Sequence, residues 1–142
     1  MTPLNARLPR LTAAFIMIVM LLDNTPAFAG WIALEKRHQP EGKQTVYYDP
    51  DTVRREEHWV TVWQLTDTRW MGEPPTPRFL SAKTRKQFDC ARWRVRVLEV
   101  VEFSRQMATG KSNNGYIQNG GWQRIEPKGA DQGLAELTCR KP

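Results

Sequence analysis

The sequence has few of the residues that build metal sites and covalent active sites. Its 142 residues include two cysteines and two histidines, which are Cys90, Cys139, His38 and His58. They form no close ligand pair of the kind found in structural zinc sites, and there is no C-x-x-C pair. No nucleophile elbow or phosphate-binding loop is present. These absences predict a protein that is not an enzyme and holds no metal and no cofactor. A pair of catalytic carboxylates is the enzymatic alternative that the sequence leaves open.

Long hydrophobic runs are also scarce. The most extended one, Leu11 to Leu22, is too short to cross a hydrocarbon core of roughly 30 Å. It follows two arginines and precedes Ala27-Phe28-Ala29, which has the small-x-small form of a signal cleavage site. We therefore predict a secretory signal peptide over 1–29, cleavage between Ala29 and Gly30, and one exported domain over 30–142 without a membrane span.

Predicted export determines how the two cysteines are interpreted. In an oxidising compartment an even number of cysteines most simply forms disulfides, and two cysteines can pair in only one way. A Cys90–Cys139 bridge closes a loop of about 50 residues, which the chain-entropy model values at roughly 4 kcal/mol. The alternatives are a reactive thiol and a zinc site, and both lack their usual neighbouring residues. The sequence predicts a structural disulfide.

Strand patterns dominate the part of the sequence that follows the signal. Short segments rich in Val, Trp, Tyr and Thr are separated by turns containing Pro, Gly and Asp, which is typical of a sheet. The predicted strands are Trp31 to Arg37, Thr45 to Asp49, His58 to Leu65, Phe79 to Asp89 and Arg92 to Phe103. Ala130 to Cys139 has leucines at helical spacing and predicts the only helix. The expected fold class is α+β, with a mainly antiparallel sheet of about five or six strands, one C-terminal helix and a single domain.

The last two predicted strands are joined by a very short connection. Only two residues separate Asp89 from Arg92, which is the spacing of a tight hairpin. In that register Asp89 faces Arg92. The same register sets Arg85 opposite Arg96, a like-charge pair that disfavours it.

A basic pattern lies on the same hairpin. The sequence has 21 Lys and Arg against 15 Asp and Glu, a net charge of +6, and its most basic strand reads Arg92-Trp93-Arg94-Val95-Arg96-Val97. Side chains alternate between the two faces of a strand, so its three guanidinium groups share one face with two cations of the paired strand. The predicted basic stripe consists of Lys83, Arg85, Arg92, Arg94 and Arg96. Arginine binds planar oxyanions through two nitrogens, so the stripe suits a sulfated glycosaminoglycan, a lipopolysaccharide phosphate or an acidic protein.

Other interpretations of the charged and aromatic residues were weighed against this one. The stripe is alternatively a solvated surface that Asp89, Glu99 and Glu102 partly neutralise. Nucleic acid is not an expected partner, because no RNP, KH or helix-turn-helix pattern accompanies the charge. The six tryptophans are expected in the core and in sheet packing. Trp70 is the exception, because it lies in the Pro-rich loop Thr66 to Pro77 and is the candidate for an exposed contact.

Several short motifs follow one another in a distinctive order along the chain. They are Trp31, Tyr47-Tyr48-Asp49-Pro50, Val60-Thr61-Val62-Trp63-Gln64-Leu65, Ser81-Ala82-Lys83, Phe88-Asp89-Cys90 with the arginine strand behind it, Met107 to Gly110, Trp122 and Cys139. In order and spacing they resemble the bacterial surface-adhesin protein E family from Trp31 to Cys139. The resemblance implies an antiparallel sheet with a C-terminal helix held by the disulfide. It also implies a non-enzymatic, surface-associated binding role.

The resemblance carries further implications for partners and location. The characterised member of the family binds host matrix and serum proteins such as vitronectin, laminin and plasminogen, and it is dimeric. Protein ligands and a homodimer are therefore implied here. That member is a lipoprotein with a cysteine at its signal cleavage site, whereas this sequence reads Ala27-Phe28-Ala29-Gly30. We expect a periplasmic or secreted protein, with the cell surface as a further location.

Two functions of different class follow from the sequence. The first is an exported binding module that holds host matrix or serum proteins, or polyanions. The alternative is a periplasmic structural or envelope-assembly protein whose partner is another bacterial component. A shared fold does not by itself decide between them.

Overall fold

The computed structural model describes residues 30–70, 72 and 74–140. The predicted signal peptide, including Ala29 at its cleavage site, lies outside these residues. The described chain forms one antiparallel sheet of eight strands and one C-terminal α-helix, which confirms the predicted α+β class. The sheet exceeds five or six strands because it contains four very short ones, each of two or three residues.

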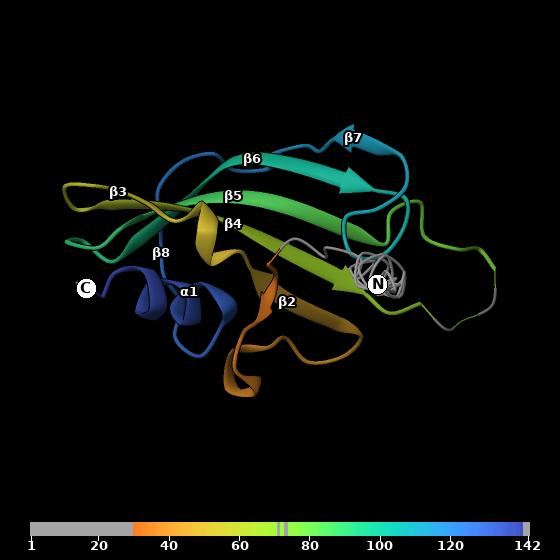
Figure 1. The fold of residues 1–142 in the computed structure, drawn as a ribbon, viewed down its shortest axis with the longest axis horizontal. Coiled ribbons are helices and arrows are strands. Elements are labelled where there is room, and N and C mark those ends of the chain that lie inside the picture. Colours follow the sequence, from red (N-terminus) through yellow and green to blue (C-terminus); the bar gives the residue numbers. More distant parts are fainter. Residues whose placement is uncertain (1–29, 71, 73, 141–142) are drawn as a thin grey trace, which may run out of the picture.

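The strands follow a simple order in the sheet. Its path is β1-β2-β4-β5-β6-β7, while β3 pairs with β4 and β8 pairs with β6. In Figure 1, β4, β5 and β6 are long strands lying side by side, and α1 lies against one side of the sheet. The bounds are β1 Ile32–Ala33, β2 Gln44–Tyr48, β3 Arg54–Glu56, β4 Trp59–Thr68, β5 Ser81–Asp89, β6 Arg94–Phe103, β7 Ser112–Asn114, β8 Gln123–Arg124 and α1 Ala130–Thr138. Two 3-10 turns, η2 Lys36–His38 and η3 Pro50–Thr52, complete the elements.

The hydrophobic core lies between α1 and one face of the sheet, here called the helix face. Alternation along the strands directs one apolar residue of each of four strands into it. These residues pack with Leu134 and Ala135 of α1 and with two residues from flanking segments. The core consists of Leu34, Val46, Val62, Phe88, Val95, Ile125, Leu134 and Ala135. The opposite face, which carries Trp59 and Trp63, is called the tryptophan face.

The first predicted strand, over Trp31 to Arg37, was too long. Only Ile32–Ala33 pairs with β2, and the chain then turns into η2. The amide of Gln39 explains the early end. Its Nε2 donates to the carbonyls of Leu34 and Val46, at 2.9 and 2.8 Å, and its Oε1 accepts from the Val46 N–H at 2.7 Å. A side chain thus takes the hydrogen-bonding positions that a longer strand would have filled.

The strand pair β3–β4 was missed in part. Sequence pattern predicted the strand from His58 to Leu65, whereas β4 runs from Trp59 to Thr68 and β3 precedes it as its hairpin partner. The β3 sequence Arg54-Arg55-Glu56 is fully charged and exposed. Charged residues give no hydrophobic alternation, so the pattern carries no strand signal there.

The predicted register of the β5–β6 hairpin was wrong by two residues. Asp89 pairs with Arg94 rather than Arg92, and the connecting turn has four residues instead of two. Asp89 Oδ1 accepts hydrogen bonds from the N–H groups of Ala91 and Arg92 at 3.1 and 3.0 Å, which closes the longer turn. The shift also removes the predicted like-charge pair, because Arg96 now lies opposite Gln87, and a bulge between Arg85 and Lys86 sets Arg85 opposite Glu99.

The disulfide prediction is confirmed. Cys90 and Cys139 are bonded, with their Cα atoms 5.6 Å apart and a separation of 49 positions in sequence. Cys90 begins the β5–β6 turn and Cys139 caps the end of α1. The bond therefore holds the terminal helix to the hairpin. No helix within the described residues is long and apolar enough to cross a membrane.

Gly133 lies in the middle of α1, where glycine normally weakens a helix. A Cβ atom at this position would lie 2.7 Å from Cγ of the buried His38, which packs under the helix. We expect Gly133→Ala to lower the free energy of unfolding by about 1–2 kcal/mol, because overpacking outweighs the better helix propensity of alanine. Chemical denaturation measures the change.

The control for this prediction is the same substitution in a His38→Gly background, because alanine would keep the His38 Cβ atom, which lies 2.9 Å from the new Cβ. Without the His38 side chain, Gly133→Ala should be neutral or stabilising by up to about 1 kcal/mol. Equal destabilisation in both backgrounds would show that the close approach to His38 is not the reason for the glycine.

Candidate functional site

The tryptophan face gathers most of the predicted basic stripe. Lys83 and Arg85 of β5 lie opposite Leu65 and Trp63 of β4 in the strand register. Arg94 and Arg96 of β6 pair with Asp89 and Gln87 of the same β5 face. Residues that pair directly in an antiparallel sheet point to the same side. Four of the five stripe cations therefore share one face, despite the altered register.

Arg92 does not belong to this face. It lies in the turn between β5 and β6 and is exposed to solvent. The sequence placed it on the strand because the turn was expected to end two residues earlier. Trp93 leaves the strand for the same reason, and its φ of 54° is a turn conformation.

Two of the arginines are held by acidic residues of the chain itself. Arg94 Nη2 lies 2.9 Å from Oδ2 of Asp89, whose side chain is 1% exposed. Arg85 Nε lies 3.3 Å from Oε2 of Glu99, and both of these side chains are close to half exposed. The first pair is buried on its acidic side, while the second is a surface ion pair that contributes little to stability.

Asp89 has a displaced pKa. Burial raises its pKa, but the hydrogen bonds from Arg94 and from the Arg92 N–H, together with the charge of Arg94, outweigh that effect. The pKa therefore lies below the ordinary aspartate value. Asp89 stays ionised at neutral pH and holds Arg94 at the edge of the tryptophan face.

Lys83 and Arg96 have a different environment. Lys83 Nζ lies 4.9 Å from the ring centre of Trp63 and 6.0 Å from that of Trp31. Its ammonium group is thus placed over aromatic faces, an arrangement that attracts a cation through the ring quadrupole. Within the described residues, no carboxylate lies within ion-pair distance of Lys83 or Arg96.

Arg96 is the centre of a second aromatic cluster. Its guanidinium carbon lies 4.5 Å from the ring centre of Trp122 and 6.0 Å from that of Trp59, while its Nε donates to Gln87 Oε1 at 2.7 Å. Arg94 lies 5.1 Å from the same Trp122 ring, and the two tryptophan rings are 6.3 Å apart. Trp59, Trp122, Arg94 and Arg96 form what we call the Trp59–Trp122 cluster.

The tryptophans were expected in the core and in sheet packing: Trp59 and Trp63 lie on the sheet, but the expectation of the core was wrong. None of the six belongs to the core cluster, and Trp59 is 38% exposed. The signal was present in the alternation of β4, where the buried Val60 and Val62 fall between Trp59 and Trp63. Because both sets are apolar, the sequence could not say which face was buried.

Two further features of this region bear on binding. A hollow of about 250 Å³ beside the stripe is lined by Thr52, Arg54, Thr61, Val62, Trp63 and Arg85, so Arg54 adds a cation that the sequence did not single out. Trp70, predicted as an exposed contact, is partly buried, and Lys43 Nζ lies 5.5 Å from its ring centre. Within the part of the chain described, no group of His, Cys, Asp and Glu is arranged to hold a metal ion.

The fold is similar to that of known crystal structures. Haemophilus influenzae protein E in crystal form II matches with a TM-score of 0.58 and 15% identity, over 78% of this chain and 87% of that one. A second structure of the same protein matches with a TM-score of 0.58 and 16% identity, over 78% of this chain and 84% of that one. Protein E from non-typeable Haemophilus influenzae gives a TM-score of 0.54 at 15% identity, over 78% and 76%. At such identity the likeness establishes the fold.

A comparison with protein families gives the relationship itself. No significant match was found among curated protein sequences. Residues 31–140 match the family described as Surface-adhesin protein E, which confirms the resemblance seen in the sequence. Family and fold together support a surface adhesin-like, non-enzymatic role and an exported or surface location. The chain belongs to the surface-adhesin protein E family.

Proposed function

We propose that this protein is an exported binding module that recognises oxyanionic groups of a host matrix or serum protein through its tryptophan face. The shared chemistry is a carboxylate on an acidic protein segment or a sulfate on an attached glycosaminoglycan chain. Arginine and lysine bind both, and arginine does so through two nitrogens.

The observation that carries this proposal is the Trp59–Trp122 cluster. Tryptophan and arginine are the residues most enriched in binding hot spots. Here the Arg96 guanidinium carbon lies 4.5 Å from the Trp122 ring centre, and the adjacent Trp59 is partly exposed. Stacking on the ring restricts the guanidinium before a ligand arrives, which reduces the entropy lost on binding.

The internal ion pairs narrow the set of ligand-binding cations. Arg94 and Arg85 already have carboxylate partners, at 2.9 and 3.3 Å. Lys83 and Arg96 have only aromatic and amide contacts among the described residues, so their charges are available to an anion. We therefore assign the main electrostatic role to Lys83 and Arg96, and a supporting role to Arg94.

The test is a double substitution, Lys83→Ala with Arg96→Ala. We expect roughly tenfold weaker binding to immobilised vitronectin or laminin in low salt, because each lost anion contact removes about 1 kcal/mol or less at a partly exposed site. The difference from the unsubstituted protein should shrink as salt is raised. Surface plasmon resonance across a salt series measures both effects.

The matched control removes the same charge elsewhere. Lys36 and Lys111 are exposed and make no ion pair among the described residues, so Lys36→Ala with Lys111→Ala lowers the net charge equally. Equal loss in the two double variants would mean that only net charge matters, which contradicts a defined site. Parallel runs on heparin and on polyglutamate separate a sulfated ligand from an acidic polypeptide.

The location of the partner is a separate part of the proposal. Protease accessibility on intact cells, compared with osmotic-shock release, reports whether the protein reaches the outside. Crosslinking in intact cells then identifies the neighbours. A partner confined to the periplasm would favour the envelope-assembly function over the adhesin-like one.

A further inference from the structure

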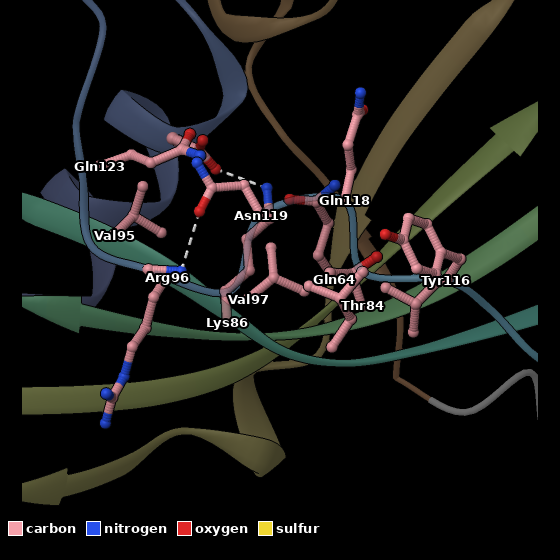
Figure 2. Close-up of a pocket in the computed structure, with 14 residues that line it drawn as sticks. Gln64, Thr84, Lys86, Val95, Arg96, Val97, Tyr116, Gln118, Asn119 and Gln123 are labelled. Carbon is pink, nitrogen blue, oxygen red and sulfur yellow. Dashed lines mark hydrogen bonds and ion pairs between the residues drawn. The ribbon is translucent and has the colours of Figure 1, made fainter.

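A cavity of about 680 Å³ lies beside the helix face of the sheet. Its floor comes from β4, β5 and β6, one wall comes from the segment 116–123, and Asp131 in the first turn of α1 closes one end. Figure 2 shows the lining side chains, with the labelled residues of 116–119 opposite those of the sheet. Its volume lies within the range of about 300–1,000 Å³ that ligand sites occupy.

Gln64 is the feature that points to a ligand. Its side chain lines the cavity and is 6% exposed. Nε2 donates to Thr66 Oγ1 at 3.1 Å, while Oε1 has no hydrogen-bond partner among the described residues. A hydroxyl can both donate and accept, so turning the amide over would only exchange which of its atoms is free. Buried polar groups are nearly always hydrogen-bonded, so the unpaired Oε1 of Gln64 indicates that a ligand group donates a hydrogen bond to it.

The charges of the cavity cancel. Lys86 Nζ lies 2.6 Å from Asp131 Oδ1, and the lysine side chain is mostly buried. Arg96 lines the cavity only with its inner part, because Figure 2 shows its side chain leading away, toward the tryptophan face. No counter-ion is left over for a charged ligand, which would lose its hydration without compensation. The cavity therefore favours a neutral molecule.

The remaining lining alternates polar and apolar groups. Thr84, Gln118 and Gln123 offer hydroxyl and amide groups, while Val97 and Val100 add apolar surface to the lining. The Gly121 N–H donates to Asn119 Oδ1 at 3.0 Å, which leaves the Asn119 amide nitrogen as a donor for a ligand. A cavity that offers both hydrogen-bond donors and acceptors suits the hydroxyl groups of a ligand, because each hydroxyl can donate and accept a hydrogen bond.

Tyr116 completes the pattern at the rim. Its side chain is 86% exposed, which is unusual for a large aromatic residue. An aromatic ring beside a polar cavity can stack on the apolar C–H face of a ring-shaped polar ligand. The amides of the lining disfavour an acyl chain, because burying unpaired amides against hydrocarbon is unfavourable.

We propose that this cavity is a binding site for a neutral saccharide of one or two sugar rings. Gln64 and the amides of 118–123 hold its hydroxyl groups, and Tyr116 stacks on one ring. The site uses the opposite side of the sheet from the tryptophan face. An experiment can therefore contradict this proposal without contradicting the polyanion-binding proposal, and the reverse also holds.

The experiment is a titration of the ¹⁵N-labelled protein with neutral sugars, namely glucose, galactose, N-acetylglucosamine and their common disaccharides, at millimolar concentrations. We expect backbone and side-chain amide shifts confined to the residues that line the cavity, above all Gln64 and residues 116–123, for at least one sugar. Gln64→Met, which keeps the volume and removes the amide, should weaken binding at least tenfold, and Tyr116→Ala should do the same. Glucuronic acid should bind at least tenfold more weakly than its neutral counterpart.

Two controls keep the outcome decisive. Gln44→Met changes the same side chain on β2 outside this cavity and should leave sugar binding unchanged. Tyr116 is exposed and outside the core, so its replacement tests the site even if Gln64→Met were to unfold. The proposal is overturned if no neutral sugar shifts these residues, if an anionic sugar or an extended peptide binds there in preference, or if Tyr116→Ala binds normally.

Discussion

Replacing Cys90 and Cys139 together by alanine is expected to lower the free energy of unfolding by about 4 kcal/mol. The bond links residues 49 apart, and the chain-entropy model assigns about 4 kcal/mol to a loop of that length. Domains of this size have total stabilities of about 5–15 kcal/mol, so the variant should be marginally folded. Urea denaturation followed by tryptophan fluorescence measures the change.

Reduction of the unsubstituted protein is the matched control. It breaks the same bond without altering packing by the substituted side chains, so the two losses should agree within about 1 kcal/mol. The loss should also come with a steeper denaturant dependence, because an unlinked unfolded chain exposes more surface. A double variant as stable as the oxidised protein would contradict a structural role for the disulfide.

Asp89→Asn is expected to lower the free energy of unfolding at pH 7 by about 2–3 kcal/mol. The carboxylate accepts two backbone hydrogen bonds in the turn and one from Arg94 at 2.9 Å, and hydrogen bonds to charged groups are worth about 1.5–3 kcal/mol. Asparagine keeps the shape but loses the charge and turns an amide toward the guanidinium. Arg94 then remains half-buried without its counter-ion, which is unfavourable.

The same residue predicts how stability depends on pH. The pKa of Asp89 is lower in the folded protein than in the unfolded chain, so its contribution is fully present above the unfolded value of about 4. The contribution is lost as the pH falls through the lower folded value. The gap in stability between the unsubstituted protein and Asp89→Asn should therefore narrow on acidification below about pH 4. Denaturation at a series of pH values between neutral and strongly acidic conditions measures it.

Glu99→Gln provides the contrast for Asp89. Its ion pair with Arg85 is close to half exposed on both sides, at 3.3 Å, so removing it should change stability by no more than about 0.5 kcal/mol. If both substitutions had the same small effect, burial of Asp89 would not be the reason for its importance. If the stability difference between the unsubstituted protein and Asp89→Asn stayed constant or widened on acidification, that result would contradict a lowered pKa of Asp89.

Much of the fold was predictable because local pattern controls it. The helix at Ala130–Thr138 follows from leucines at helical spacing, and the long strands β4, β5 and β6 follow from Val-, Trp- and Thr-rich runs. Period-two alternation also placed Arg94 and Arg96 with Lys83 and Arg85 on one face. That result survived the register error because a shift of two residues preserves the face.

Other features could not be predicted because they depend on contacts between distant segments. Gln39 ends the first strand by bonding to Val46, and Arg96 finds Trp122, which is 26 positions further along the chain. The length of the β5–β6 turn depends on backbone hydrogen bonds to the Asp89 carboxylate. The two-residue spacing between the predicted strands did not indicate these bonds. Gly133 reads as a weak point in a helix until His38 is seen beneath it.

The sequence alone therefore determined the α+β class, the basic hairpin, the disulfide partners and the family, since each rests on residue type, spacing or order along the chain. The tertiary structure decided which cations remain available, which tryptophans are exposed, and where the cavity beside Gln64 lies. Burial and hydrogen-bond pairing decide these features. Both are properties of side chains brought together from different strands and loops, and no pattern along a single strand records them.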